Sequence, residues 1–246
     1  SKKVNVLGDS NVDFGKIKKI IGDLIKRKFD VNIFVTGMHL EKKFGYTVNE
    51  IYKSFPKTKI FKFKNFSNSN NYQDKVLAKT IFGFSKYVKK IKPDLIIIHG
   101  DRVETLAAAI VGSLNNYLVA HIEGGEMSGT IDESFRHCNT KLCHSHFVSS
   151  EEAKNRVLQL GENPSNVYNV GNLSCENISN TNLLKKKQLE KKLKIKFDKK
   201  CILFTYHPIT NDPQTTRTEL DQIFKAVQKL KKINLFITHP NIDRGR

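Results

Sequence analysis

The segment HIEGGEMSGTIDESFRH, residues 121–137, contains four carboxylates, two histidines and one arginine among several glycines. Ordering glycine costs conformational entropy and burying charge costs desolvation, so this combination is more typical of a site than of a spacer. Carboxylates crowded together acquire separated pKa values, which leaves one ionised and another protonated near neutrality. Such a pair can remove and return a proton. The segment therefore predicts a site for acid–base chemistry.

The elements around this segment alternate between short β-branched runs and longer helical patterns. Strands are expected at 4–7, 31–37, 59–63, 94–100, 117–125, 146–150 and 167–171, with helices at 17–28, 75–91, 103–114, from about 133 and from 151. The run DLIIIHG (94–100) is apolar throughout and ends in glycine, as expected for a strand buried on both faces.

This alternation predicts a parallel sheet covered by helices on both faces, with ligands bound at the carboxyl ends of the strands. GDR follows DLIIIH and EGGE follows LVAHI, so both polar groups lie at such ends. After Gly171 the chain becomes rich in Asn and Lys and then repeats a strand–helix–strand pattern. We therefore expect one Rossmann-like domain over residues 1–171 and a partial, apparently truncated one over 172–246.

Four stretches carry a family resemblance: HGDRVETLAAAIVG, HIEGGEMSGTIDESFRH, TYHP and HPNID, with TGMHLEKKFGYTVNEI in addition. They resemble the hydrolysing UDP-N-acetylglucosamine 2-epimerases, including those of sialic and legionaminic acid synthesis. The resemblance covers nearly the whole chain and implies two Rossmann-like domains in a GT-B-type arrangement, with substrate between them.

The resemblance also implies a reaction. UDP leaves UDP-N-acetylglucosamine by elimination across C1–C2, and water adds to the resulting glycal to give N-acetylmannosamine, inverted at C2. It implies no metal or redox cofactor. It further implies a dimer or tetramer, although no self-complementary surface is evident in the sequence.

The acidic catalytic positions of the family match Asp101, Glu123 and Asp132, and we leave open which of them takes the C2 proton. Candidate substrate-binding residues around them are Arg102, Glu126, Arg136 and His137. Arg102 and Arg136 are expected to pair with diphosphate oxygens, and His137 to hydrogen-bond the sugar or orient a carboxylate.

Simpler structural roles compete with these assignments. Asp101 could cap the helix that begins in GDRVETL. Glu126 could equally be an exposed loop carboxylate. His121 and His99 close strands, and we interpret both as hydrogen-bonded core histidines. His39 has no assigned role.

Two further residues are expected to bind UDP: His207 in TYHP and Asn241 in HPNID, both in the second domain. At the amino end, NVDFGK resembles a phosphate-side loop, but Asn11 stands where the family has arginine. Leu173 replaces a common proline. Asn11 and the end of the chain at Arg246 motivate an alternative hypothesis of a truncated, non-catalytic nucleotide-sugar-binding protein.

The formal net charge is +18. Such an excess could suit nucleic acid or an anionic membrane, but the lysines are spread throughout and no base-reading motif is present. We interpret the charge as a solvated surface that attracts anionic substrates, and expect neither nucleic-acid nor membrane partners. No apolar run approaches the roughly 20 residues of a membrane span.

The chain has four cysteines in no regular framework, and SKKVNVLG at its start lacks the pattern of a signal peptide. We therefore expect a cytoplasmic location. HCNTKLCHSH places Cys138, Cys143, His144 and His146 together, but the spacing fits no zinc motif. We interpret the two cysteines as helix-packing thiols and expect no metal.

The leading hypothesis is a hydrolysing UDP-N-acetylglucosamine 2-epimerase. The rivals are the truncated binding protein, an epimerase of a related 2,4-diacetamido UDP-sugar, and a basic nucleic-acid-binding protein.

Overall fold

The computed structural model describes residues 1–9, 11–42, 45–65, 72–179, 181–206 and 213–238, with backbone only for 11–13, 213 and 214. It divides into two compact units, Ser1–Thr181 and Asn182–Arg246.

A parallel seven-stranded sheet forms the centre of the first unit, in the order β3-β2-β1-β4-β5-β6-β7. Its strands are β1 (Lys3–Gly8), β2 (Asp30–Val35), β3 (Lys59–Lys62), β4 (Leu95–His99), β5 (Leu118–Ile122), β6 (Ser145–Val148) and β7 (Val167–Asn169). The helices are α1 (Asn11–Lys26), α2 (Val48–Ser54), α3 (Gln73–Ile91), α4 (Val103–Leu114), α5 (Ile131–Leu142), α6 (Glu151–Gln159) and α7 (Leu173–Ser179), with 3-10 turns at Gly37–Leu40 and Pro164–Asn166.

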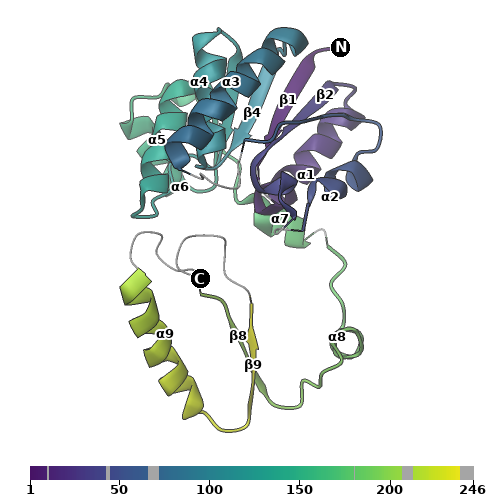
Figure 1. Ribbon diagram of the computed structural model, residues 1–246, viewed down its shortest axis with the longest axis vertical. Helices are drawn as coiled ribbons and strands as arrows, with labels where there is room; N and C mark the ends of the chain where they lie inside the picture. The colour runs from purple at the N-terminus through teal and green to yellow at the C-terminus, as the bar shows by residue number, and fades with distance from the viewer. Residues whose placement is uncertain (10, 43–44, 66–71, 180, 207–212, 239–246) are drawn as a thin grey trace. The chain divides into compact units, whose positions relative to one another are not determined.

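Helices cover both faces of this sheet: α3 and α4 lie on one face, and α1 and α2 on the other (Figure 1). The sequence of β4 is apolar because helices cover the strand on both faces. Ile97 packs toward α1, whereas Ile96 and Ile98 pack toward α3 and α4. The predicted α/β class with a parallel, doubly covered sheet is confirmed.

Strand order reverses between β1 and β4, since the chain proceeds from β1 toward β3 on one side and from β4 toward β7 on the other. In such sheets the crevice at the carboxyl ends of the strands beside the reversal is the usual ligand site. Asp9, Asp101 and Glu123 follow β1, β4 and β5 at this edge, which we call the carboxyl edge of the sheet.

The first unit extends beyond the expected boundary at residue 171 because α7 packs on α1. Asn177 Nδ2 donates a hydrogen bond to the Gly15 carbonyl at 2.9 Å, and Lys19 Nζ lies 2.9 Å from Glu176 Oε1. Leu173, at the start of α7, packs against the α1-side core. The segment after β7 thus belongs to the first unit.

The second unit has the expected strand–helix–strand pattern. It contains α8 (Lys186–Leu193), β8 (Lys200–Phe204), α9 (Pro213–Gln228) and β9 (Ile233–Ile237). β8 and β9 pair in parallel, with Ile202 opposite Leu235. A parallel pair requires a crossover connection, which α9 provides.

Candidate functional site

The carboxyl edge of the sheet is connected by hydrogen bonds between strand ends. The Gly100 amide donates to the Ile122 carbonyl at 3.0 Å, which joins the turn after β4 to the end of β5. Thr105 Oγ1, in the first turn of α4, donates to Asp9 Oδ2 at 3.2 Å. Three acidic residues from distant parts of the chain therefore occupy neighbouring strand ends.

Glu123 is the most buried of the predicted carboxylates, with a side chain that is 8% exposed. Lys16 Nζ, from α1, donates to its Oε2 at 2.6 Å, and His99 Nε2, at the end of β4, lies 3.0 Å from the same oxygen. The backbone of Glu123 has a φ of 60°. A left-handed conformation is unfavourable for a non-glycine residue and is typical of functional sites.

These contacts determine the protonation state of Glu123. Burial by itself raises the pKa of the carboxyl group, but hydrogen bonding and charge from His99, and then from Lys16, lower it more. The pKa falls from its usual 4.5 to about 2. Glu123 is therefore ionised at neutral pH, so in the unliganded protein it is equipped to accept a proton rather than to donate one.

A depressed pKa makes this site sensitive to acid. Because the pKa is lower in the folded than in the unfolded protein, the ionised group stabilises the fold above about pH 4.5, and this contribution is lost as the pH falls toward about 2. Urea unfolding at a series of acidic pH values should show wild-type protein losing stability faster than Glu123→Gln. The matched control Glu50→Gln, exposed on α2, should follow wild type. Parallel profiles for Glu123→Gln and wild type would contradict the assignment.

Asp101 is held by a buried arginine. Arg136 Nη2, on α5, donates to Asp101 Oδ2, and its Nη1 donates to the Glu126 carbonyl at 2.7 Å. The guanidinium therefore joins the end of β4 to the loop before α5. This geometry favours a positioning role for Arg136, whereas the sequence suggested a contact with diphosphate.

Asp132 lies in the first turn of α5, half-buried, and accepts a hydrogen bond from Thr130 Oγ1 at 3.2 Å. It precedes Arg136 by four residues, so both side chains lie on one face of the helix. Asp132 is thus one helical turn from the partner of Asp101. Its neighbour Glu133 fixes the preceding loop by accepting from the amides of Ser128 and Gly129 at 2.7 and 2.8 Å.

The remaining candidates have their own partners. Arg102 Nε lies 3.7 Å from Glu104 Oε2, and His137 Nε2 lies 3.8 Å from Glu133 Oε1. Glu126 Oε1 accepts from Ser149 Oγ at 2.5 Å, so its carboxylate is not a free loop group.

The N-cap position of α4 is occupied by Arg102, not by Asp101. The capping alternative for Asp101 is therefore wrong.

Close packing explains the paired glycines after Glu123. A Cβ at Gly125, whose φ is 81°, would lie 2.2 Å from the Ala153 carbonyl oxygen, and one at Gly124 would lie 2.9 Å from His121 Nδ1. Only glycine fits both positions. The loop can therefore pass between α6 and the end of β5.

His121 is the hydrogen-bonded core histidine that the sequence suggested. It is fully buried, and its Nε2 donates to the Gly100 carbonyl at 2.8 Å. Burial lowers its pKa to about 3, so the ring is neutral. His39 is also buried, with Nδ1 2.7 Å from Thr47 Oγ1 and its ring edge-on to Phe14.

Two members of the site were missed by the sequence analysis: Lys16 and His99. His99 is buried as predicted, but it contacts Glu123 rather than serving only the core. Lys16 ends the NVDFGK motif, which is not a loop but the start of α1. The sequence offered one signal for each: His99 immediately precedes GDR, and Lys16 belongs to the motif compared with a phosphate-side loop.

The Cys/His segment does not converge. Cys143 is buried, whereas Cys138 is exposed, so the packing role predicted for Cys138 is wrong. His144 Nδ1 accepts from the Val119 amide at 3.2 Å, and His146 Nε2 lies 3.1 Å from Glu162 Oε2. Within the described residues, no group of three or more His, Cys, Asp or Glu side chains is placed to hold a metal ion.

His207 and Asn241, the candidate UDP contacts of the second unit, lie outside the described residues. Across the described helices, none has the length and apolar character required to cross a membrane.

The sequence of this chain matches a known protein family. The sequence model described as "UDP-N-acetylglucosamine 2-epimerase" matches residues 23–246. The chain is 36% identical over 246 residues to the GDP/UDP-N,N'-diacetylbacillosamine 2-epimerase (hydrolyzing) of Campylobacter jejuni, covering 99% of this chain and 64% of the relative. It is 33% identical over 250 residues to the UDP-N-acetylglucosamine 2-epimerase of Neisseria meningitidis, with coverage of 99% and 64%.

Solved structures share the fold. The crystal structure of UDP-GlcNAc 2-epimerase from Neisseria meningitidis bound to UDP-GlcNAc matches with a TM-score of 0.82 at 21% identity, covering 99% of this chain and 67% of that one. The Methanocaldococcus jannaschii enzyme in complex with UDP-GlcNAc and UDP matches with a TM-score of 0.76 at 24% identity, covering 96% and 66%. The chain spans about 64% of the length of the curated relatives. From the family model and the identities above 30%, the chain belongs to the UDP-N-acetylglucosamine 2-epimerase family.

Proposed function

We propose that the full-length protein is a hydrolysing 2-epimerase that releases UDP from a UDP-linked 2-acetamido sugar and inverts C2. The observation that carries the proposal is the buried carboxylate of Glu123, held ionised at the carboxyl edge of the sheet by Lys16 and His99. Removal of the weakly acidic C2 proton requires a positioned base, and Glu123 is the described carboxylate with a pKa of about 2.

The proposed first step is an anti elimination. A carboxylate takes the proton from C2, the C1–O bond to UDP breaks, and the glycal and UDP result. In the second step water adds its hydroxyl to C1, and an acid delivers a proton to C2 on the opposite face. The products are UDP and the C2-inverted free sugar, such as N-acetylmannosamine. No redox change occurs, and the proposal includes no cofactor.

We assign Glu123 to the proton abstraction, with Asp101 and Asp132 completing the acid–base set. A base with a pKa of about 2 is weak. The diphosphate is an anion that competes with Glu123 for the Lys16 ammonium group. Once Lys16 contacts phosphate, the carboxylate loses its nearest cation, its pKa rises, and it becomes a better base. Substrate binding and activation of the base are thereby linked through one lysine.

Support for a UDP-sugar comes from the names and contents of the relatives. The Neisseria meningitidis structure was solved with UDP-GlcNAc bound, and the Methanocaldococcus jannaschii structure with UDP-GlcNAc and UDP. His207 and Asn241 remain the residues we propose for the UDP side. We also propose a cytoplasmic setting, from the free cysteines, and a homo-oligomeric state, as the family resemblance implies.

A second substrate has specific support. The relative from Campylobacter jejuni, at 36% identity, and one from Legionella pneumophila, at 30%, are both named as N,N'-diacetylbacillosamine 2-epimerases. A 2,4-diacetamido UDP-sugar is therefore the alternative to UDP-GlcNAc. The same elimination and hydration apply to either sugar, because both carry the acetamido group at C2.

The test is isotope incorporation by the full-length protein in deuterated water, with UDP-GlcNAc and the 2,4-diacetamido UDP-sugar assayed in parallel. We expect release of UDP and a free, C2-inverted sugar that carries one deuterium at C2, with a higher kcat/KM for the true substrate. Mass spectrometry and proton NMR detect the label. Release of UDP with no deuterium at C2 would show simple hydrolysis and exclude the elimination. No turnover of either sugar would reject the proposed function.

A further inference from the structure

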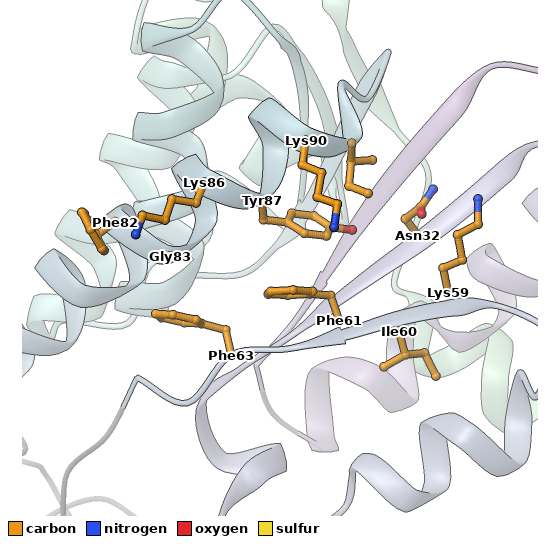
Figure 2. A pocket seen from close by; sticks show the side chains of 11 residues that line it. Asn32, Lys59, Ile60, Phe61, Phe63, Phe82, Gly83, Lys86, Tyr87 and Lys90 are labelled. Atoms are coloured by element: carbon orange, nitrogen blue, oxygen red, sulfur yellow. The ribbon is translucent and has the colours of Figure 1, made fainter.

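A second hollow shares no lining residue with the candidate site. A cavity of about 400 Å³ is bounded by the edge strand β3 and helix α3 (Figure 2). Its volume is in the range of small-molecule sites.

Aromatic rings line this cavity. Phe61 extends from β3, Phe63 follows the strand, and Tyr87 lies opposite on α3 (Figure 2). The Phe61 and Tyr87 ring centroids are 5.0 Å apart, and Phe61 also stacks on the buried Phe34 at 5.6 Å. Phe61 nevertheless remains 44% exposed. Phe61 is therefore held by Phe34 and Tyr87 while part of its side chain stays accessible to a ligand.

Lysines surround the aromatic rings: Lys59 on β3 and Lys86 and Lys90 on α3. No carboxylate lines the cavity. Lys59 is partly neutralised by Asp30, 3.4 Å away. Lys86 Nζ lies 4.2 Å from the centre of the Phe82 ring, and neither Lys86 nor Lys90 has a carboxylate partner among the described residues. The opening is therefore positively charged and complements an anion.

One amide side chain, that of Asn32, lines the cavity beside Lys59, and a second amide lies next to it on β1 outside the lining. Asn5 is opposite Asn32 in the β1–β2 register, with its side chain on the same face of the sheet. Asn5 is completely buried, and its amide nitrogen and oxygen have no hydrogen-bond partner in the described part of the chain. Buried unpaired amides are rare and indicate bound water or another polar group nearby.

We propose that this cavity binds a small aromatic anion. Its ring stacks on Phe61 and Phe63, and its carboxylate, sulfonate or phosphate group lies between Lys86 and Lys90. The limited volume of the hollow favours a compact molecule over an extended peptide. The site is independent of the proposed epimerase reaction, with which it shares no residue.

The probe for the test is 8-anilino-1-naphthalenesulfonate, titrated into full-length protein with UDP at saturation and followed by fluorescence. We expect one bound probe per chain. The double variant Lys86→Gln/Lys90→Gln should weaken binding by about tenfold or more, because it removes both cations. The uncharged N-phenyl-1-naphthylamine should bind wild type at least about tenfold more weakly than the sulfonate, for the same reason.

A matched control is available on the same helix. Lys79→Gln/Lys89→Gln removes the same charge from exposed positions that do not line the cavity, and should leave affinity unchanged. Phe61→Ser, which removes the stacking surface, should weaken binding like the cavity lysine variant. Turnover of the UDP-sugar should be unaffected by Lys86→Gln/Lys90→Gln.

Four results would overturn the proposal. Equal losses in the two double-lysine variants would show a general charge effect, and equal affinity for the neutral probe would show simple hydrophobic binding. Displacement of the probe by UDP would place it in the nucleotide site. A change of mass by light scattering in Phe61→Ser would show that the cavity is an interface between copies of the chain.

Discussion

Glu123→Gln is expected to lower turnover of the UDP-sugar by about 100- to 10,000-fold, the usual contribution of a positioned general base. Glutamine has nearly the same shape but cannot accept a proton from C2. The loss should appear in kcat, and KM should not rise, because the variant releases Lys16 to contact the diphosphate. Steady-state assays of UDP release by the full-length protein measure both constants.

Glu50→Gln is the matched control for this variant, since it makes the same chemical change at an exposed position on α2. Circular dichroism and thermal unfolding should show that Glu123→Gln retains the fold. A folded Glu123→Gln protein with turnover within about twofold of wild type, well below the contribution of a general base, would remove Glu123 from the mechanism. It would leave Asp101 and Asp132 as the candidates for proton abstraction.

Arg136→Met should destabilise the protein by about 3 kcal/mol and also reduce activity strongly. Methionine replaces the aliphatic volume of arginine but leaves the Asp101 carboxylate and the Glu126 carbonyl without their donor. Removing one member of a buried ion pair leaves an uncompensated charge, which typically costs about 3–5 kcal/mol. The lower end applies because the Asp101 side chain is 25% exposed. Urea unfolding of the wild type and the variant measures the difference.

Arg136→Lys separates charge from geometry. An ammonium group keeps the positive charge but cannot donate to both partners in the fixed planar arrangement of a guanidinium group. We expect its unfolding free energy and activity to lie between those of wild type and Arg136→Met. Equal stability of all three proteins would mean that Arg136 does not hold the loop before α5 against the end of β4.

The strands of the first unit were predictable because burial patterns are local. The apolar run at 94–100 predicted a strand covered on both faces, and β4 is such a strand, with Ile96 and Ile97 in opposite cores. Parallel order then follows from the alternation with helices, which places Asp101 and Glu123 at strand ends on one edge of the sheet. The position of Asp101 and Glu123 at the carboxyl edge of the sheet could therefore be predicted from the sequence alone.

The start of α1 was missed although its pattern was present. Phe14, Ile17 and Ile21 have helical spacing and are all buried, but the helix was expected only from residue 17. The motif comparison with a phosphate-side loop outweighed this periodicity. Lys16 was consequently placed in a loop, whereas it lies on the helix that faces Glu123.

The partners of the carboxylates were not predictable from a single sequence. Lys16 and Glu123 are 107 positions apart, and Asp101 and Arg136 are 35 apart. Composition and periodicity say nothing about such pairs. His99 and His121 both end buried strands, and only their contacts distinguish them, because one touches Glu123 and the other a backbone carbonyl.

The contact between α7 and α1 has a mechanical consequence. Asn177 donates to the Gly15 carbonyl, in the same turn of α1 that carries Lys16. The polypeptide therefore leaves the first unit from a segment fastened to the helix that holds the Glu123 carboxylate. We expect tension on the chain after Thr181 to act first on α1, and through it to change the distance between the Lys16 ammonium group and the Glu123 carboxylate.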